Sequence, residues 1–317
     1  MLAAMRTERP APEHRPVMLR ETLEALAPGP GRLLLDGTIG LGGHAAAWLE
    51  RSAPDGRVLG FDRDRRALEQ SRRRLAPFGR RVALVHESYD RAPDLVRPGR
   101  VDAVLLDLGL GSHQLDDPER GFSFRDDGPL DMRFDPDRPG PTAAELVART
   151  PQPQLAALFA ELGEIRGARR LARVICEERA REPIRTTGRL AEIVRRALPA
   201  RPAGRSRIDP ATQAFQALRI AVNDELGRLE RALDGLVDLL APGGRIAVIS
   251  FHSLEDRIVK RTLRRLAAGG EPSPITGQPT AELVLELGTR RPLRPSEDEI
   301  AANPRARSAR LRWGIRR

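Results

Sequence analysis

The sequence is poor in cysteine, in lysine and in aromatic residues. Cys176 is the only cysteine, which excludes an internal disulfide and a zinc site built from cysteine ligands. Phenylalanine, tyrosine and tryptophan make up 3% of the 317 residues, which argues against a large surface for stacking nucleic-acid bases. Lys260 is the only lysine, so the basic character of the chain comes almost entirely from arginine.

Long apolar runs are missing as well. No stretch approaches the roughly 20 apolar residues that a membrane-spanning helix needs. Residues 1–15 contain arginine, glutamate and proline and lack the apolar segment of a signal peptide. We therefore expect no membrane partner and a cytoplasmic location.

The formal net charge of +10 has two interpretations. A basic chain is typical of proteins that bind a polyanion such as RNA. The near-exclusive use of arginine, together with abundant alanine, glycine and proline, is also typical of codon bias in a GC-rich genome. Charge alone therefore leaves nucleic-acid binding open.

Short apolar runs alternate with helical segments in the first third of the chain, a pattern typical of a parallel α/β sheet. Helices are expected from His44 onward and over residues 64–76. The predicted fold class is α/β with a Rossmann-like core. The expected strands are residues 32–36, 57–61, 82–86, 101–106 and, much later, 245–250, followed by closing strands at 282–287 and 309–314.

A long helical stretch separates the fourth expected strand from the fifth. Apolar residues recur at helical spacing over residues 155–181 and 189–198, and a helical region at 211–240 leads into the fifth strand. Residues 267–280 are expected to form a loop. We predict a core domain of residues 1–132 and 208–317, with residues 133–207 inserted as a helical substrate-recognition domain.

Three features occur where expected strands end. The first strand leads into a glycine-rich turn at residues 36–44, where a ligand can lie against bare backbone and the free N–H groups of the next helix. Asp62 follows the second strand, where a carboxylate typically binds both ribose hydroxyls. Asp107 follows the fourth strand, near the topological switch point of the sheet. The order of these features predicts a nucleoside-binding pocket.

The turn also indicates which nucleoside cofactor to expect. It does not follow G-x-G-x-x-G, and no G-x-x-x-x-G-K-[ST] segment exists, so a dinucleotide and P-loop ATP are both disfavoured. Asp36 precedes the glycines and suits an ammonium group, while Asp36 and Asp107 together suit a sulfonium cation. S-adenosylmethionine carries both cations and a ribose for Asp62, so it is the predicted cofactor.

Basic and aromatic residues interleave just after the fourth strand. Phe122 and Phe124 lie between Arg120 and the later arginines Arg125 and Arg133, an arrangement typical of a site where a flipped RNA base enters. The alternative is that both phenylalanines belong to the core and the arginines are solvated.

Sequence blocks between residues 14 and 308 resemble the bacterial small-subunit ribosomal RNA cytosine-N4 methyltransferases. They stand in that family's order and include its opening segment, its glycine turn and its C-terminal motif. The blocks are residues 14–19 (HRPVML), 36–44 (DGTIGLGGH), 107–117 (DLGLGSHQLDD), 120–125 (RGFSFR), 128–133 (GPLDMR), 215–220 (FQALRI), 250–257 (SFHSLEDR) and 303–308 (NPRARS).

The resemblance implies N4-methylation of a cytidine in the decoding region of 16S ribosomal RNA, with S-adenosylmethionine as the methyl donor. The implied partner is ribosomal RNA within the small subunit, and the oligomeric state stays open, a homodimer included. Tyr89 stands where the family usually has phenylalanine, and its ring can pack on adenine. Matching the motifs gives as cofactor contacts Gly42, Gly43, His44, Asp62, Tyr89, Asp107 and Gln114.

Asp107 and His252 are the candidate catalytic residues. The cytosine N4 amine is a poor nucleophile because its lone pair is delocalised into the ring. Asp107 would accept a hydrogen bond from this amine and so orient it, and its alternative role is cofactor binding alone. His252 follows the fifth strand and would bind the base or move a proton, or else hold backbone groups in a loop. This reaction requires no metal.

Some segments depart from the family's pattern. Gly111 and His113 replace serine and proline after the fourth strand, and residues 162–166 (LGEIR) differ from Y-G-E-E-R. Residues 209–214 (DPATQA) stand in place of H-P-A-T-R-T, which removes two groups able to contact RNA. Two alternatives therefore stay open: a methyltransferase for another RNA base or small acceptor, and a non-catalytic ribosome-assembly protein that retains the fold.

Overall fold

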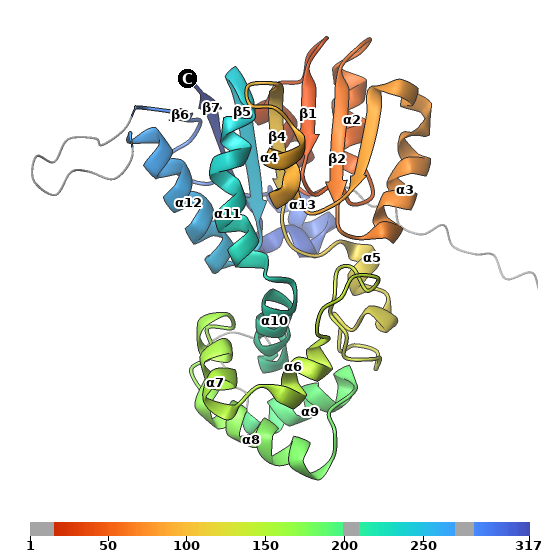
Figure 1. The fold of residues 1–317 in the computed structure, drawn as a ribbon, viewed down its shortest axis with the longest axis vertical. Helices are drawn as coiled ribbons and strands as arrows, with labels where there is room; N and C mark the ends of the chain where they lie inside the picture. The colour runs from red at the N-terminus through yellow and green to blue at the C-terminus, as the bar shows by residue number, and fades with distance from the viewer. Residues whose placement is uncertain (1–15, 199–208, 270–281) are drawn as a thin grey trace, which may run out of the picture.

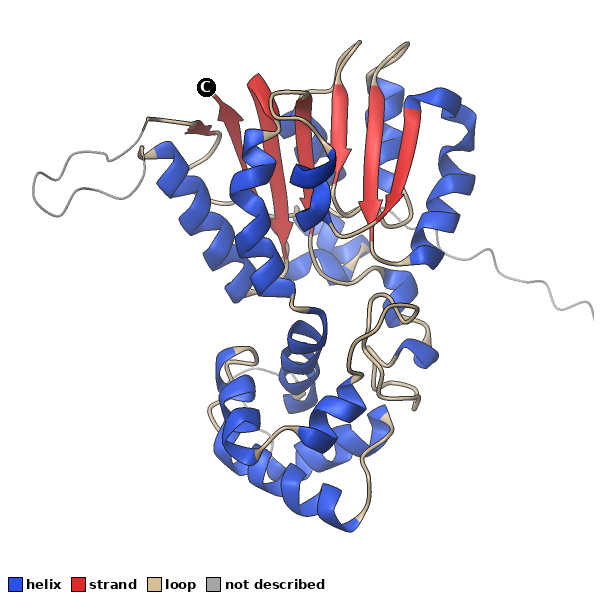
Figure 2. Ribbon diagram, viewed as in Figure 1, coloured by secondary structure: helices blue, strands red, loops and turns tan. Residues whose placement is uncertain are grey.

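The computed structural model describes residues 16–198, 209–269 and 282–317 (Figure 1). An α/β layer holds the sheet, and a smaller lobe of helices lies beyond the edge where the parallel strands end (Figures 1 and 2). Most of the loop expected at residues 267–280 lies outside the described residues, as do residues 14–15 of the opening block and residues 199–207 of the expected insertion.

Seven strands form one sheet in the order β3-β2-β1-β4-β5-β7-β6. The strands β1 to β5 pair in parallel, whereas β7 is antiparallel to both β5 and β6. This sheet confirms the predicted α/β fold. The strands are β1 (Leu33–Asp36), β2 (Arg57–Asp62), β3 (Val82–His86), β4 (Val101–Asp107), β5 (Leu240–Ser250), β6 (Leu285–Leu287) and β7 (Arg310–Arg316).

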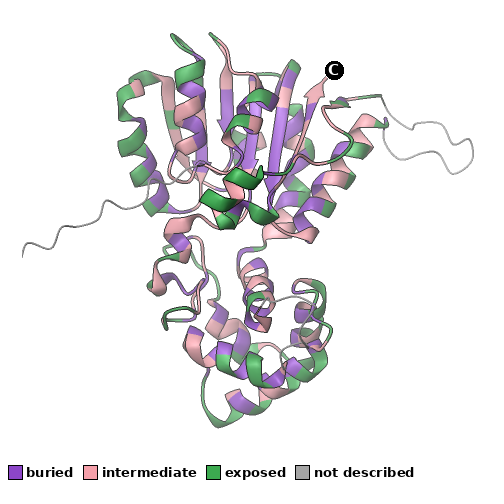
Figure 3. Ribbon diagram, turned by 180° about the vertical axis from the view of Figure 1, so that it is seen from behind, coloured by how far each residue is buried: buried purple, intermediate pink, exposed green. Residues whose placement is uncertain are grey.

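Helices cover both faces of the sheet and bury an apolar cluster on each. One face carries α1 (Leu19–Leu26), α2 (Gly43–Arg51) and α3 (Arg65–Leu75). The other carries α4 (Ala92–Leu95), α11 (Glu225–Asp238) and α12 (Ser253–Ala267). Figure 3 shows the resulting pattern, with buried residues concentrated in the strands and exposed residues on the outer turns of helices. Two shorter helices are α5 (Ser112–Leu115) and α13 (Glu297–Ala302).

The start and orientation of α3 follow from its local sequence. The Asp64 carboxylate accepts hydrogen bonds from the N–H groups of Arg66 and Ala67, which have no partner within the helix. Leu68 and Leu75 are buried against the sheet, and the arginines at 72–74 are exposed. These arginines form a solvated face, which is the ordinary arrangement for an amphipathic helix.

The helical lobe has its own buried core. Its helices are α6 (Ala143–Arg149), α7 (Gln152–Glu161), α8 (Ala168–Arg181), α9 (Thr187–Ala197) and α10 (Pro210–Asn223). The buried cluster also takes in Phe122 and Leu130 before α6, and Phe215 and Leu218 of α10. The domain boundaries at residues 133 and 207 stay a prediction. In the structure, residues beyond these boundaries, such as Leu130 and Phe215, also pack into the core of the helical lobe.

Asn223 links the two lobes at the C-terminal end of α10. Its side-chain oxygen accepts a hydrogen bond from Phe134 N at 2.9 Å, and its amide donates to the carbonyl of Met132 at 2.7 Å. Its own carbonyl oxygen accepts from the Arg63 guanidinium of the α/β layer at 3.0 Å. Asp224 then adopts a φ of 50°, which separates α10 from α11.

A second polar contact joins the lobes on another side. Glu164, in the turn between α7 and α8, accepts hydrogen bonds from the Ser253 hydroxyl and the Arg257 guanidinium of α12. The helical spacing noted over residues 155–181 corresponds to two helices, α7 and α8, which this turn separates. A side chain at Gly163 would meet the carbonyl oxygen of Phe159 at 2.9 Å, so the turn also needs a residue without a Cβ.

No helix within the described ranges is long and apolar enough to cross a membrane.

We predict that Asn223→Ala lowers the free energy of unfolding by about 2–4 kcal/mol, because it leaves the Phe134 N–H and the Met132 carbonyl buried without partners. Asn223 is 2% exposed, so water does not replace the amide easily. Urea denaturation monitored by circular dichroism measures the change. The control is Gln154→Ala on the exposed face of α7, which should change stability by less than about 0.5 kcal/mol. Equal effects of the two substitutions would contradict the assignment.

Candidate active site

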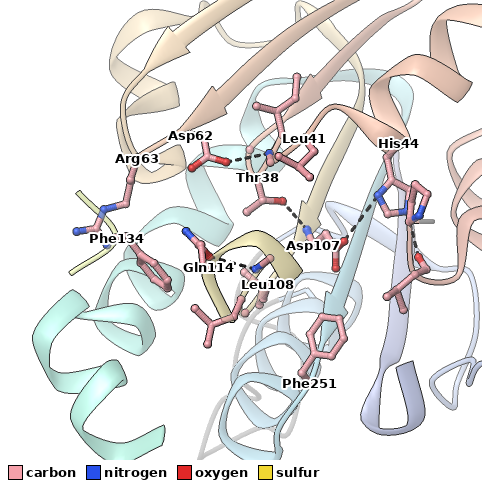
Figure 4. Close-up of a pocket in the computed structure, with 18 of the residues that line it drawn as sticks. Thr38, Leu41, His44, Asp62, Arg63, Asp107, Leu108, Gln114, Phe134 and Phe251 are labelled. Atoms are coloured by element: carbon pink, nitrogen blue, oxygen red, sulfur yellow. Dashed lines mark hydrogen bonds and ion pairs between the residues drawn. The ribbon is translucent and has the colours of Figure 1, made fainter. Parts of the chain in front are cut away.

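A pocket opens at the carboxyl edge of the sheet, where the three features singled out in the sequence come together (Figure 4). The glycine turn, Asp62 and Asp107 all line it, contributed by the ends of β1, β2 and β4. Asp36 lies behind the turn, 2% exposed, and accepts a hydrogen bond from Thr38 N at 3.1 Å. The convergence of strand ends expected for a parallel sheet is therefore present.

Two hydrogen bonds tie the glycine turn to the strands on either side. Gly40 N donates to Asp62 Oδ2 at 2.8 Å, and Asp107 N donates to the Thr38 hydroxyl at 2.6 Å. A Cβ at Gly37 would lie 2.5 Å from Leu106 Cδ2, so the backbone must pass bare at this point. The turn is thus held rigidly across the floor of the pocket.

The buried carboxylates of the pocket have strongly altered acidity. Burial raises the pKa of Asp36 to about 7, against the hydrogen bond from Thr38. Burial, followed by the negative charges of Asp36 and Glu255, raises the pKa of Asp107 well above its ordinary value. The Oδ1 atom of Asp107 is buried and has no hydrogen-bond partner in the structure. Such an atom favours a ligand that donates a hydrogen bond or carries positive charge.

His44 lies at the Asp107 end of the pocket, at the start of α2. Its Nε2 atom lies 3.0 Å from the carbonyl oxygen of Val17, and its Nδ1 atom lies 3.7 Å from Asp107 Oδ2. The ring is 6% exposed. His44 therefore joins the segment before α1 to the Asp107 carboxylate, and Figure 4 shows it beside Asp107.

Asp64 anchors the opposite wall of the pocket. Gln114 Nε2 and an Arg120 guanidinium nitrogen donate to Asp64 Oδ2 at 2.9 and 2.7 Å. Burial opposes ionisation of Asp64, but the hydrogen bonds from its neighbours hold its pKa well below the ordinary value. Arg120 also donates to the Phe134 carbonyl at 2.9 Å. This network fixes the loop after β4 against the start of α3.

Aromatic and cationic groups line the end of the pocket nearest Asp62. The Arg63 guanidinium lies 5.6 Å above the centre of the Phe134 ring, and that ring stacks on Phe122 at 5.5 Å. Tyr89 lines the same wall, following β3. Phe134 and Arg63 were not among the predicted contacts, although each stands next to a residue that was, Arg133 and Asp62.

Most of the predicted cofactor contacts line the pocket, namely Gly43, His44, Asp62, Tyr89, Asp107 and Gln114. Gly42 does not. It precedes α2 with a φ of 75°, and a Cβ there would meet Ser71 Oγ at 2.8 Å. The placement of Gly42 gives it a role in packing α2 against α3. The ligand contacts of the other six residues stay predictions.

The His252 side chain is not among the pocket-lining groups. It stands at the start of α12, where its Nδ1 atom accepts a hydrogen bond from Glu255 N at 3.5 Å, and its Nε2 lies 3.1 Å from Glu255 Oε1. Glu255 itself lines the pocket and accepts hydrogen bonds from Phe251 N and His252 N. This geometry is that of the alternative expected from the sequence, a loop histidine that holds neighbouring groups.

The residues predicted to contact RNA do not form one surface. Arg120 is 6% exposed and Phe122 is 5% exposed, both directed into the protein. Phe124 is half-buried with its ring edge against Phe215. Arg133 forms a two-point ion pair with Asp131, which occupies its guanidinium.

Of the predicted RNA-contacting set, Arg125 alone is exposed. The inward direction of Arg120 has a clear physical reason, because its charge is compensated by buried Asp64.

Several pocket residues come from parts of the chain that the sequence did not single out for the site. They are contributed by α11, by the residue after β5 and by the segment before β7, and they include Glu225, Arg228, Phe251, Asn303 and Arg305. Two of these segments, the one after β5 and the one before β7, fall within the sequence blocks at residues 250–257 and 303–308, which were the only signals that could have indicated them. In the described part of the chain, no group of three or more histidine, cysteine, aspartate or glutamate side chains is arranged to hold a metal ion.

Comparison with known proteins gives matches along nearly the whole chain. A family model described as the MraW methylase family matches residues 11–317. The protein named "Ribosomal RNA small subunit methyltransferase H" from Symbiobacterium thermophilum is 51% identical over 309 residues, covering 94% of this chain and 95% of that protein. The protein of the same name from Thermobifida fusca is 50% identical over 310 residues, covering 96% and 93%. Among solved structures, an rRNA methylase from Streptococcus thermophilus matches with 12% identity, a TM-score of 0.41 and coverage of 94% and 93%.

The raised pKa of Asp36 predicts how stability depends on pH in the ligand-free protein. The folded state binds this proton more tightly than the unfolded chain, so the contribution of Asp36 to stability falls as pH rises from 3.8 to about 7. Asp36→Asn removes this titration and keeps an oxygen for Thr38 N. Between pH 5 and 7 we expect the free energy of unfolding of the wild type to fall, relative to the variant, by roughly 1 kcal/mol per pH unit. Urea denaturation at several pH values measures both, and parallel pH profiles would refute the assignment.

Proposed function

Because the chain belongs to the MraW methylase family, we propose that it transfers the methyl group of S-adenosylmethionine to the N4 amine of a cytidine in small-subunit ribosomal RNA. The match over residues 11–317 confirms the family resemblance found in the sequence blocks. One observation carries the chemistry: a single pocket combines the bare glycine turn, Asp62, and an Asp107 oxygen that is buried without a partner. The proposed location is the cytoplasm.

The end of the pocket near Asp62 fits the nucleoside part of the cofactor. Asp62 accepts one backbone hydrogen bond on each oxygen, from Asp64 N and from Gly40 N, which fixes the carboxylate and leaves lone pairs for ribose hydroxyls. Tyr89 and Phe134 supply aromatic surface for adenine at this end. Gln114 is held by Asp64 and closes the same wall.

The end of the pocket near Asp107 fits the methionine part. S-adenosylmethionine supplies an electrophilic methyl group on a positively charged sulfur. The carboxylate of Asp107 lies at this end, and Asp36 is buried behind the glycine turn, so both favour positive charge. The Nδ1 atom of His44 lies 3.7 Å from Asp107 Oδ2. A positive charge bound next to Asp107 would lower the pKa of this carboxyl group and keep it ionised.

Asp107 is the residue that we assign to the methyl-transfer step itself. The ionised Asp107 carboxylate accepts a hydrogen bond from the N4 amine and so fixes the direction of the amine. When the nitrogen takes the methyl group and the electron pair of the broken S–C bond stays on sulfur, the carboxylate would stabilise the positive charge on the amine and take the proton that the amine loses. The backbone of Asp107 cannot shift, because Thr38 holds its N–H and β4 is paired on both sides. We propose that His252 positions Glu255 and does not itself move a proton.

The substrate reaches the pocket from the side of the helical lobe. Arg125, in the segment between β4 and α6, and exposed arginines of the lobe such as Arg169 and Arg170 supply positive charge for phosphates. Asp209, which stands where the family usually has histidine, caps α10 and pairs with Arg195 at 2.8 Å. This change therefore has a structural role in the lobe.

The proposed reaction is tested with radiolabelled methyl donor and small ribosomal subunits that lack the modification. We expect label in N4-methylcytidine after digestion to nucleosides. Label in another nucleoside would show a different acceptor. Absence of both labelling and cofactor binding by calorimetry would favour a non-catalytic assembly protein.

We predict that Asp62→Ala raises the Kd for S-adenosylmethionine by about 10- to 100-fold, since it removes charge-assisted hydrogen bonds to the ribose. Isothermal titration calorimetry measures this change. Asp55→Ala, an exposed carboxylate at the opposite edge of the sheet, is the control and should leave the Kd unchanged. A Kd for Asp62→Ala within twofold of the wild type would rule out the ribose contact.

We predict that Asp107→Asn lowers kcat by about 10²- to 10⁴-fold, because a neutral amide stabilises the positive charge on the amine less than the carboxylate does and cannot take the amine proton. The Kd for S-adenosylmethionine should also rise, by less than about 10-fold, because the neutral amide attracts the cationic cofactor less than the carboxylate does. Single-turnover methylation separates the chemical step from product release. A variant with wild-type kcat and weakened cofactor binding would assign Asp107 to binding alone.

A further inference from the structure

Phe251 stands at the Asp107 end of the pocket, directly after β5. The strand pairing sets Ile249 opposite Asp107, and Leu108 N donates to the Ile249 carbonyl at 3.0 Å. Phe251 N is fixed in turn by Glu255 Oε2 at 2.8 Å. Backbone hydrogen bonds therefore position the Phe251 ring relative to Asp107.

The loop after β4 leaves room for this ring. Gly109 has a φ of 97°, and a Cβ there would lie 3.3 Å from Phe251 Cδ2. Residues 108–111 contain no aromatic side chain of their own. The half-buried ring packs against the core on one side and lines the pocket on the other (Figure 4).

The other aromatic rings of the pocket are placed differently. Phe134 is stacked on Phe122 and covered by the Arg63 guanidinium. Tyr89 packs against the backbone of Gly37, where an added Cβ would lie 2.8 Å from Tyr89 Cβ. Figure 4 shows Phe134, Arg63 and Asp62 grouped at one end and Phe251 apart from them, below Asp107. Among the described residues, no aromatic ring stacks on Phe251 and no guanidinium covers it.

We propose that Phe251 is the platform on which the target pyrimidine base stacks while its amine faces Asp107. This proposal rests on the proposed function and names a further positioning residue for it. A base taken out of an RNA strand loses its stacking neighbours, and one aromatic face returns about 1–3 kcal/mol of that loss. The platform favours any flat pyrimidine, and the amine contact with Asp107 then selects cytosine.

Three substitutions separate stacking from packing. Phe251→Leu keeps apolar volume against the core but removes the flat face, whereas Phe251→Tyr and Phe251→Trp keep the face. Phe78→Leu is the matched control, because Phe78 is half-buried against the same core cluster and does not line the pocket. Urea denaturation of each variant confirms that it is folded.

We expect Phe251→Leu to lower kcat/KM for small subunits by about 5- to 150-fold, the equivalent of losing 1–3 kcal/mol of stacking. The Kd for S-adenosylmethionine should stay within about twofold of the wild type. The tyrosine and tryptophan variants should recover kcat/KM to within about fivefold, and Phe78→Leu should match the wild type.

Two results would overturn the platform without touching the proposed function. One is wild-type kcat/KM in a folded Phe251→Leu variant. The other is a raised cofactor Kd that accounts for the whole loss, which would place Phe251 in the cofactor site. Failure of the wild-type protein to methylate small subunits at all would instead contradict the proposed function.

Discussion

The site depends on two hydrogen bonds that tie the turn after β1 to its neighbours on both sides. Gly40 N binds Asp62 at the end of β2, and Thr38 binds Asp107 N at the end of β4. Since β1 lies between these strands, the turn sets the separation of the two carboxylates without any contact between their side chains. Burial makes ionisation of Asp36 and Asp107 unfavourable in the ligand-free protein and raises the pKa of both. A cationic ligand relieves this cost, so the same arrangement that weakens the fold favours the cofactor.

A second set of contacts makes the helical lobe part of the site. Asp64 holds Gln114 and Arg120, and Asn223 holds the backbone at Met132 and Phe134. Residues 120–134 therefore run from the pocket wall into the core of the helical lobe. These hydrogen bonds connect the helical lobe directly to the pocket wall near Asp62. This coupling explains why a charged residue is buried at position 120, where it joins segments that are distant in sequence.

The fold could be predicted further than the site, for physical reasons that particular residues show. Apolar runs such as residues 101–106 are recognisable as buried strands, and parallel strands necessarily bring their carboxyl ends to one edge. The direction in which an arginine side chain points cannot be recognised from the sequence in this way. Arg120, just before Phe122 and Phe124, has the same local pattern whether it faces RNA or a buried carboxylate 56 positions earlier in the chain. The role of His252 was ambiguous for the same reason. The sequence does not show whether its ring faces the pocket or pairs with Glu255 at the start of α12, as it does in the structure.

Pocket residues contributed by tertiary packing were the hardest to predict. Phe251 and Arg305 reach the pocket only because β5 lies beside β4 and the segment before β7 returns to the same edge. The most direct test of the account is a crystal structure with S-adenosylhomocysteine and cytidine bound. We predict the ribose hydroxyls within hydrogen-bond distance of Asp62, and the N4 amine facing the Asp107 carboxylate beside the sulfur. A ribose bound away from Asp62, or an amine directed away from Asp107, would contradict it.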